Sequence, residues 1–112
     1  MTVKGSCHCG AVSISLPPPD YRMQCNCTLC TRTGWTGLYA DPAEVSIEGG
    51  EHCQSYIQGD KMITLWRCGH CGIATHWTPI TAAPDRMGIN ARLFNPDWWE
   101  ALEVRYSDGR SY

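Results

Sequence analysis

Eight cysteines in a chain of 112 residues constrain this protein more than any other feature of its sequence. Seven fall into three short clusters, Cys7-His8-Cys9, Cys25-Asn26-Cys27-Thr28-Leu29-Cys30 and Cys68-Gly69-His70-Cys71, and Cys53 stands alone. Residues 1–6 contain no apolar segment of the kind found in secretory signals, so we expect a cytoplasmic protein with reduced thiols. Cysteines spaced this closely in a reducing compartment favour metal binding over disulfides.

Cys68 and Cys71 have the spacing of a zinc knuckle, in which two intervening residues turn the chain so that both sulfurs face one metal. The following Gly72 can adopt the positive φ that such a turn often needs. A structural zinc takes four ligands in a tetrahedron. Cys7 and Cys9 are the natural second pair, because residues two apart on an extended segment point the same way. We therefore predict a structural zinc that closes a loop of nearly sixty residues and restricts the unfolded chain.

The second cluster, Cys25, Cys27 and Cys30, places three sulfurs within six residues. Three protein ligands with one open position are typical of a catalytic zinc. Three thiolates would leave the complex with a net negative charge, so the metal would suit a thiol ligand better than the activation of water. We predict a catalytic zinc at this triplet, more easily lost than the four-ligand zinc, and a small thiol as substrate.

Three other interpretations of the cysteines are open. Disulfides are one, although the Cys-x-Cys spacing argues against them. The triplet could also be a metal-free redox cluster, or a structural site completed by a histidine. The candidate histidines are His8, His52, His70 and His76. We interpret Cys53 as a small, packed apolar side chain.

Short runs of alternating apolar and polar residues between turn residues predict a mainly-β chain. The expected strands are residues 11–16, 45–48, 55–58, 62–66, 73–77, 87–91 and 102–106, with Gly59-Asp60 as the turn of a hairpin. Only residues 95–100 resemble a helical turn, with Pro96 at a first-turn position. We expect residues 1–112 to form a single domain, because the chain has the commonest size of one.

Charge and hydropathy exclude two classes of partner. The 9 basic and 11 acidic residues are interspersed and give a net charge of −2. Because the sequence has no basic patch, we expect no nucleic-acid partner. We also expect no membrane span, because no run approaches the ~18 apolar residues that a membrane helix needs.

The order of the cysteine clusters resembles that of the glutathione-dependent formaldehyde-activating enzyme family, which includes the centromere protein V-like proteins. Residues 5–12, 25–32, 67–72 and 89–93 carry the resemblance. It implies a small Mss4-like fold of twisted antiparallel sheets stapled by the four-cysteine zinc, and the same division of zinc ligands. It also implies a carbon–sulfur lyase that condenses formaldehyde with glutathione to S-hydroxymethylglutathione, with the glutathione sulfur approaching the open zinc.

Three further residues are candidates for the substrate pocket. Arg32 lies two positions past Cys30, where its guanidinium could meet a substrate carboxylate or offset the thiolate charge. The alternative for Arg32 is a solvated surface arginine. Trp35 is the best aromatic candidate for a pocket wall, and Arg92 would share one side of a strand with Asn90.

Two other functions are compatible with the sequence. One is a non-catalytic, zinc-stabilised binding module in which the triplet is structural or vestigial. The other is a thiol redox protein, similar in fold to B-type methionine sulfoxide reductases. Residues 88–92, where those enzymes carry a catalytic cysteine, contain none here, which disfavours the redox function.

Overall fold

The computed structural model describes residues 1–57, 61–80 and 86–107. The strands are β1 (Val3–Ser6), β2 (Ser13–Leu16), β3 (Tyr21–Cys25), β4 (Gly37–Ala40), β5 (Ser46–Glu48), β6 (Cys53–Ile57), β7 (Ile63–Cys68), β8 (Ala74–Pro79), β9 (Met87–Asn90) and β10 (Glu103–Ser107). The helices are α1 (Thr28–Thr33) and α2 (Pro96–Trp99), with single 3₁₀ turns η1 (Pro42–Glu44), η2 (Gly50–His52) and η3 (Ala91–Leu93). The expected mainly-β chain is confirmed.

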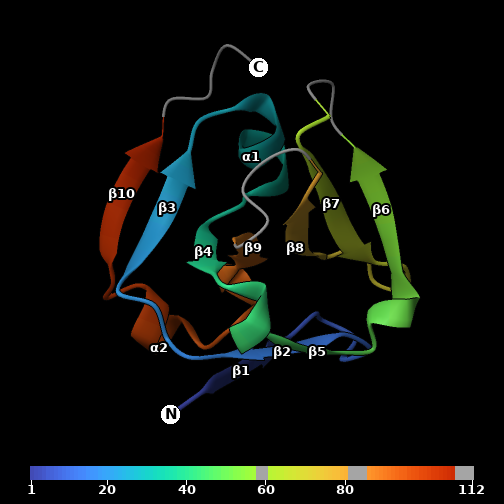
Figure 1. Cartoon of the computed structure of the whole chain (residues 1–112), viewed down its shortest axis with the longest axis horizontal. Helices are drawn as coiled ribbons and strands as arrows, with labels where there is room; N and C mark the ends of the chain where they lie inside the picture. Colours follow the sequence, from blue (N-terminus) through green and yellow to red (C-terminus); the bar gives the residue numbers. More distant parts are fainter. Residues whose placement is uncertain (58–60, 81–85, 108–112) are drawn as a thin grey trace.

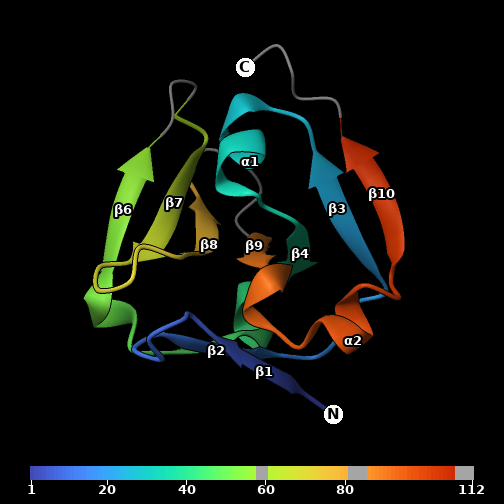
Figure 2. The same cartoon turned by 180° about the vertical axis from the view of Figure 1, so that it is seen from behind.

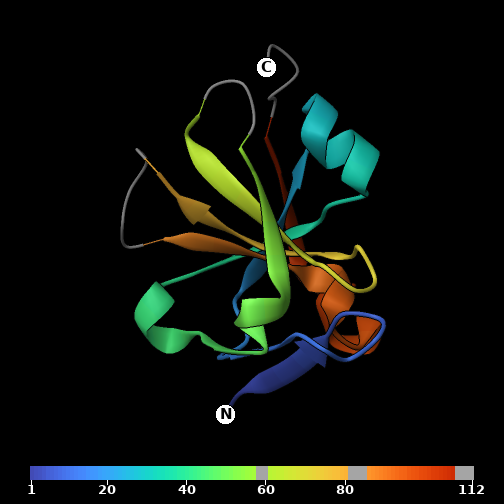
Figure 3. The same ribbon diagram turned by 90° about the vertical axis from the view of Figure 1, so that its right-hand side faces the viewer.

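Two twisted sheets make up the fold (Figure 1). The large sheet has the strand order β10-β3-β4-β9-β8-β7-β6, and the small sheet has the order β1-β2-β5. The paired strands run antiparallel, as expected, except that β10 lies parallel to β3 at one edge. The small sheet lies across one end of the large sheet, and α1 lies at the opposite end (Figures 1 and 3).

The main core lies where β2 packs against the large sheet. Ile14 and Leu16 on β2 are fully buried, whereas Ser13 and Ser15 alternate with them, as the sequence pattern predicted. They pack with Leu38 of β4, with Ile89, which pairs with Leu38 from β9, and with residues near α2. Helix α2 lies beside the small sheet (Figure 2). The full cluster is Ile14, Leu16, Leu38, Met87, Ile89, Ala91, Leu93, Phe94 and Trp99. Burying each Ile or Leu stabilises the fold by about 1.5–3 kcal/mol, which fixes the small sheet in place.

The expected hairpin is formed by β6 and β7. Their register runs from Cys53 opposite Cys68 to Ile57 opposite Thr64. The turn predicted at Gly59-Asp60 lies outside the described residues. Among the described residues, no helix has both the length and the apolar character required to cross a membrane.

The expectation that only residues 95–100 are helical is wrong, because α1 follows β3. Helix α1 begins at a sulfur cap, in which the Cys30 N–H donates to the Cys27 Sγ atom at 3.3 Å. It ends at Gly34, whose φ of 71° is left-handed. Oxygen-bearing side chains are the usual N-caps, so the sequence rules overlooked a cysteine in that position. The cap places two sulfurs of the triplet at the start of one helix.

Candidate metal centres and the hollows beside the cysteine triplet

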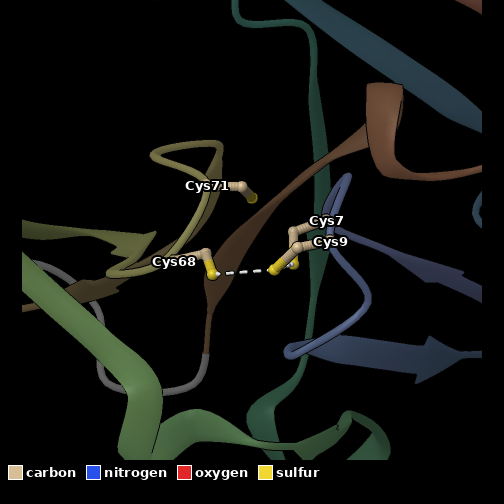
Figure 4. A group of neighbouring side chains, drawn as sticks. All are labelled: Cys7, Cys9, Cys68 and Cys71. Carbon is tan, nitrogen blue, oxygen red and sulfur yellow. Dashed lines mark hydrogen bonds between the residues drawn. The ribbon is translucent and has the colours of Figure 1, made fainter.

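Two turns from distant parts of the chain bring four cysteines together (Figure 4). Cys7 and Cys9 lie after β1, Cys68 ends β7 and Cys71 lies in the turn that follows it. All four Sγ atoms are within 4.8 Å of one another. The Cys9 Sγ atom is 3.7 Å from the Cys7 Sγ atom and 3.6 Å from the Cys68 Sγ atom. Four sulfurs bound at 2.3 Å in a tetrahedron lie about 3.8 Å apart, so the arrangement of this four-cysteine set fits a zinc.

The cysteines are not paired as disulfides. All eight are free thiols. The 3.6 Å and 3.7 Å separations within the four-cysteine set are far longer than a sulfur–sulfur bond. This geometry counts against the disulfide alternative and in favour of metal binding.

The turn at Cys68 has the form of the predicted knuckle. The Cys68 N–H donates to the Ile73 carbonyl at 2.9 Å, and the Gly72 N–H donates to the Cys68 carbonyl at 2.9 Å. Gly72 has a φ of 79°, the positive value expected from the sequence. The Cys68 Sγ atom accepts the His70 N–H at 3.4 Å. Backbone donors therefore stabilise negative charge on this sulfur.

Cys7 and Cys9 lie in a turn, so the extended segment predicted for them is wrong. The Gly10 N–H donates to the Cys7 carbonyl at 3.1 Å, and Gly10 has a φ of 81°. The Cys7 N–H donates to the Val12 carbonyl at 3.0 Å, and the Val12 N–H donates to the Cys7 Sγ atom at 3.4 Å. The pair therefore forms a second knuckle-like turn, and it is this turn that brings both sulfurs to one place.

The four thiols differ in acidity because backbone donors are unevenly distributed among them. The N–H groups of Cys9 and Ile73 lower the pKa of Cys71 to about 6. The Cys71 N–H lowers the pKa of Cys68 against the effect of burial. The Ala11 N–H lowers the pKa of Cys9, but burial and the Cys68 thiol outweigh it and raise that pKa to about 11. A bound cation would therefore favour deprotonation of the whole set.

The cysteine triplet lies at the junction of β3 and α1. Cys25 ends β3, Cys27 caps α1, Cys30 lies in its first turn, and the three Sγ atoms are within 4.8 Å of one another. The Cys27 N–H donates to the Cys25 Sγ atom at 3.5 Å. Within the part of the chain that the structure describes, no His, Asp or Glu side chain joins this group. That disfavours a structural site completed by a histidine and fits a three-ligand metal site.

The triplet thiols also oppose one another's ionisation. Burial raises the pKa of Cys30, and the neighbouring Cys27 and Cys25 groups raise it further. Burial acts in the same direction on Cys27, but the Cys30 N–H and the adjacent thiols outweigh it and lower the pKa of Cys27. The triplet on its own therefore favours partial ionisation, and a bound divalent cation would stabilise three thiolates.

Two hollows flank the triplet, and both are lined by Cys25, Cys30, Trp35 and Ser107. The polar hollow has a volume of about 520 Å³. Its other principal residues are Gln24, Asn26, Thr31, Arg92 and Tyr106. The apolar hollow has a volume of about 210 Å³. Its principal residues besides the cysteines are Met23, Leu29, Tyr39, Leu65, Trp77 and Arg86.

Arg92 is the arginine of the polar hollow. Its Nε–H donates to the Gly34 carbonyl at 2.8 Å, and its guanidinium lies 5.6 Å from the centre of the Trp99 ring. These contacts hold a positive charge beside the sulfurs. Arg32 is exposed, as Arg92 is, but it lies in the last turn of α1 and is not among the residues that line either hollow. A role for Arg32 in substrate recognition stays a prediction.

Trp35 forms a wall shared by both hollows, as the sequence suggested. Only 6% of it is exposed. Gly37 makes room for it, because an added Cβ at that position would lie 2.7 Å from the Trp35 Nε1 atom. The expectation that Asn90 and Arg92 share one side of a strand is wrong, because β9 ends at Asn90 and Arg92 lies in η3. The Asn90 amide donates to the Ala74 carbonyl at 2.8 Å, and its oxygen accepts the Arg92 N–H at 3.0 Å. Asn90 therefore positions the backbone that carries Arg92.

Sequence reasoning missed the contribution of β10 to the site. Ser107 lies opposite Cys25 in the parallel pairing of β10 with β3, and its carbonyl accepts the Asn26 N–H at 3.3 Å. Tyr106 precedes it on the wall of the polar hollow. No local motif marks these residues, because they reach the triplet only through strand pairing.

Cys53 is packed, as predicted. It is half-buried against the cluster of Cys7, Val12 and Cys68, and burial raises the pKa of its thiol. Its Sγ atom lies 3.9 Å from the Thr75 Oγ1 atom.

Comparisons with known proteins found a family and two relatives. The family model described as "Glutathione-dependent formaldehyde-activating enzyme" matches residues 2–107. A Halomonas elongata protein named "Putative glutathione-dependent formaldehyde-activating enzyme" is 36% identical over 63 residues, which are 50% of this chain and 40% of that protein. The chain therefore matches less than half the length of that relative. A crystal structure of a Rhodobacter sphaeroides protein superposes with a TM-score of 0.75 at 31% identity, covering 93% of this chain and 99% of the other.

Proposed function

Because the chain belongs to the glutathione-dependent formaldehyde-activating enzyme family, we propose that it is a zinc-dependent enzyme joining a small thiol to an aldehyde. The reference substrates are glutathione and formaldehyde, and the reverse reaction is that of a carbon–sulfur lyase. One observation supports this most strongly: Cys25 and Cys30, two of the three converging cysteines, line a hollow of about 520 Å³. That volume lies in the ~300–1,000 Å³ range of small-molecule sites.

In this proposal the two cysteine sets have different tasks. Cys7, Cys9, Cys68 and Cys71 hold a structural zinc, and Cys25, Cys27 and Cys30 hold a catalytic zinc that is lost more easily because it has one ligand fewer. When bound to the triplet, zinc supplies a positive centre that favours the thiolate form of a neighbouring thiol. Residues 1–112 form one domain, and the free cysteines favour a reducing compartment such as the cytoplasm.

The chain's own residues bind and orient the thiol. Glutathione carries two carboxylates and two amides, which suit the donors and acceptors of the polar hollow. Arg92 offers a guanidinium to one carboxylate, and charge-assisted bonds of this type are the strongest polar contacts available there. Gln24 and Asn26 add amide side chains to the same wall, where the Gln24 amide donates to the Trp35 carbonyl at 3.4 Å. Trp35 adds an apolar wall to the same hollow, which would limit access of water.

The proposed reaction needs no oxidant or reductant. The thiol sulfur adds to the carbonyl carbon, so that one carbon–sulfur bond forms and the carbon–oxygen double bond becomes single. The thiol proton ends on the carbonyl oxygen. Holding thiol and aldehyde side by side converts an encounter in solution into a reaction within one site.

Turnover measured by NMR tests the proposed function. Zinc-loaded protein should accelerate the exchange between formaldehyde, glutathione and S-hydroxymethylglutathione. The variant with Cys25→Ser, Cys27→Ser and Cys30→Ser should lose at least about a hundredfold of this rate while it stays folded. A non-catalytic binding module predicts equal rates for the two proteins, and that result would reject the proposal.

A further inference from the structure

The apolar hollow is larger than a formaldehyde adduct requires. Its volume is about 210 Å³. A water molecule takes a ~30 Å³ share of its liquid, so the hollow has room for about seven groups of that size. A hydroxymethyl group has two non-hydrogen atoms and would leave most of this space unfilled.

We propose that the apolar hollow binds an apolar substituent on the carbonyl carbon of the substrate, so that the chain acts on thiol adducts of apolar aldehydes larger than formaldehyde. This inference rests on the proposed function, since it takes the triplet as the place where the thiol sulfur meets the aldehyde. The bonds formed and broken are the same as for formaldehyde.

The position of the hollow relative to the triplet supports this assignment. Cys25, Cys27 and Cys30 all line it, so a carbon bonded to a substrate sulfur at the triplet would lie beside this hollow. The polar hollow meets Cys25 and Cys30 from another side. A substrate with a polar thiol moiety and an apolar aldehyde moiety would therefore place one moiety in each hollow.

The lining of the hollow comes from strands of the large sheet and from α1. Tyr39 and Trp77 pack edge to face with their ring centres 6.0 Å apart. Leu65 on β7 lies opposite Trp77 in the sheet, and Leu29 precedes Cys30 on α1. These side chains offer aliphatic and aromatic surface, which favours a hydrocarbon chain over a polar group.

The charged residue of the lining is already engaged. Arg86 lies with its guanidinium 4.4 Å from the centre of the Tyr39 ring, a distance typical of a cation–π contact. The volume of about 210 Å³ is also below the ~300–1,000 Å³ of pockets that enclose a whole drug-sized ligand. The hollow therefore suits one apolar substituent of a larger substrate.

Binding of S-alkylglutathiones tests the inference without turnover. These thioethers carry alkyl groups of one to eight carbons and are titrated into zinc-loaded protein by calorimetry. Affinity should rise by about two- to fourfold for each added carbon up to about six carbons, because each methylene leaves water for an apolar wall. Affinity that is independent of chain length overturns the inference.

Two variants locate the effect. Leu65→Asn places an amide in the hollow and should lower the affinity for S-hexylglutathione at least about tenfold, with S-methylglutathione within about twofold. Ile57→Asn is the matched control, because Ile57 is 51% exposed on β6 and is not among the residues of either hollow. If Leu65→Asn does not fold, Leu29→Trp, which fills the hollow, gives the same readout. If folded Leu65→Asn or Leu29→Trp keeps the wild-type ratio of affinities for S-hexylglutathione and S-methylglutathione, the inference is overturned.

Turnover separates this inference from the proposed function. Formaldehyde and straight-chain aldehydes are compared as substrates with glutathione. If formaldehyde reacts and the affinity for S-alkylglutathiones does not depend on the length of the alkyl chain, the inference fails and the proposed function stands. If affinity rises with chain length and no aldehyde reacts, the proposed catalysis fails while the apolar site stands.

Discussion

The Sγ atom of Cys9 lies 3.6 Å from the Sγ atom of Cys68, although 59 positions separate the two residues. Cys9 follows a strand of the small sheet and Cys68 ends a strand of the large sheet, so this contact joins the two sheets. Cys7 and Cys68 are buried and pack with Val12. A zinc at this position would therefore act as both a staple and a part of the core.

Cys68→Ser should destabilise the fold strongly. It removes one ligand of the four-cysteine set and leaves a hydroxyl where the sulfur is fully buried. We expect the free energy of unfolding of zinc-loaded protein to fall by at least about 3 kcal/mol in urea titrations. Cys53→Ser is the matched control, because Cys53 lies opposite Cys68 in the hairpin and is outside the four-cysteine set. Equal losses in the two variants would contradict the structural role.

Gly88→Ala should displace Trp77 from the wall of the apolar hollow. An added Cβ would lie 1.9 Å from the Trp77 Nε1 atom, which is too close for the indole to keep its place. We expect a loss of about 1–3 kcal/mol in urea unfolding and a shift in tryptophan fluorescence. Gly50→Ala is the control, because the Cβ there meets only the Ile47 side chain, at 3.6 Å. Stability equal to that of the control would disprove this packing.

Arg92→Met should weaken glutathione binding. Loss of a charge-assisted contact in the polar hollow is expected to raise the KM for glutathione at least about tenfold, with a smaller change in kcat. Arg32→Met should change neither constant by more than about twofold, because Arg32 is exposed and does not line the hollow. Steady-state kinetics with varied glutathione measures both. A larger increase in the KM for glutathione in Arg32→Met than in Arg92→Met would contradict this and indicate that Arg32 contacts the substrate.

His76 should make stability dependent on pH. Its ring is stacked on Trp66, its Nδ1 atom lies 2.9 Å from the Thr75 Oγ1 atom, and burial lowers its pKa from 6.5 to about 4. Because the folded pKa is below the unfolded one, the unfolded chain takes up the proton first. The contribution of neutral His76 is thus fully present above pH 6.5 and is lost as the pH falls toward 4.

The comparison with His76→Gln isolates this contribution. Between pH 7 and pH 5, wild type should lose roughly 2 kcal/mol more free energy of unfolding than the variant. Urea titrations at both pH values, with the metal content matched, measure the difference. Identical pH dependence in the two proteins would show that the imidazole does not titrate as its burial requires.

The grouping of the cysteines could be predicted because metal chemistry constrains it. Cys68 and Cys71 are too few for a structural zinc, and Cys7 and Cys9 were the remaining closely spaced pair. The alternation in β2 likewise predicted the burial of Ile14 and the position of the strand. Occupancy of both sites by zinc stays a prediction.

The hollows could not be predicted, because they depend on pairings between distant strands. Strand β3 was not predicted, although Tyr21-Arg22-Met23-Gln24-Cys25 alternates apolar and polar residues. In the structure all five residues of this strand are half-buried. Its parallel partner β10 brings Ser107 to Cys25. Arg92 lines the polar hollow, whereas Arg32, only two residues from Cys30, does not. Closeness in sequence was a poor guide to closeness in space here.

Native mass spectrometry of zinc-loaded protein tests the central claim, that the triplet holds a second zinc to which a thiol is drawn. We expect two zinc ions in the wild type, and one in the variant with Cys25→Ser, Cys27→Ser and Cys30→Ser. One added glutathione should be retained by the wild type and not by the variant. A variant that keeps two zinc ions, or that retains glutathione as well as the wild type does, would contradict the account.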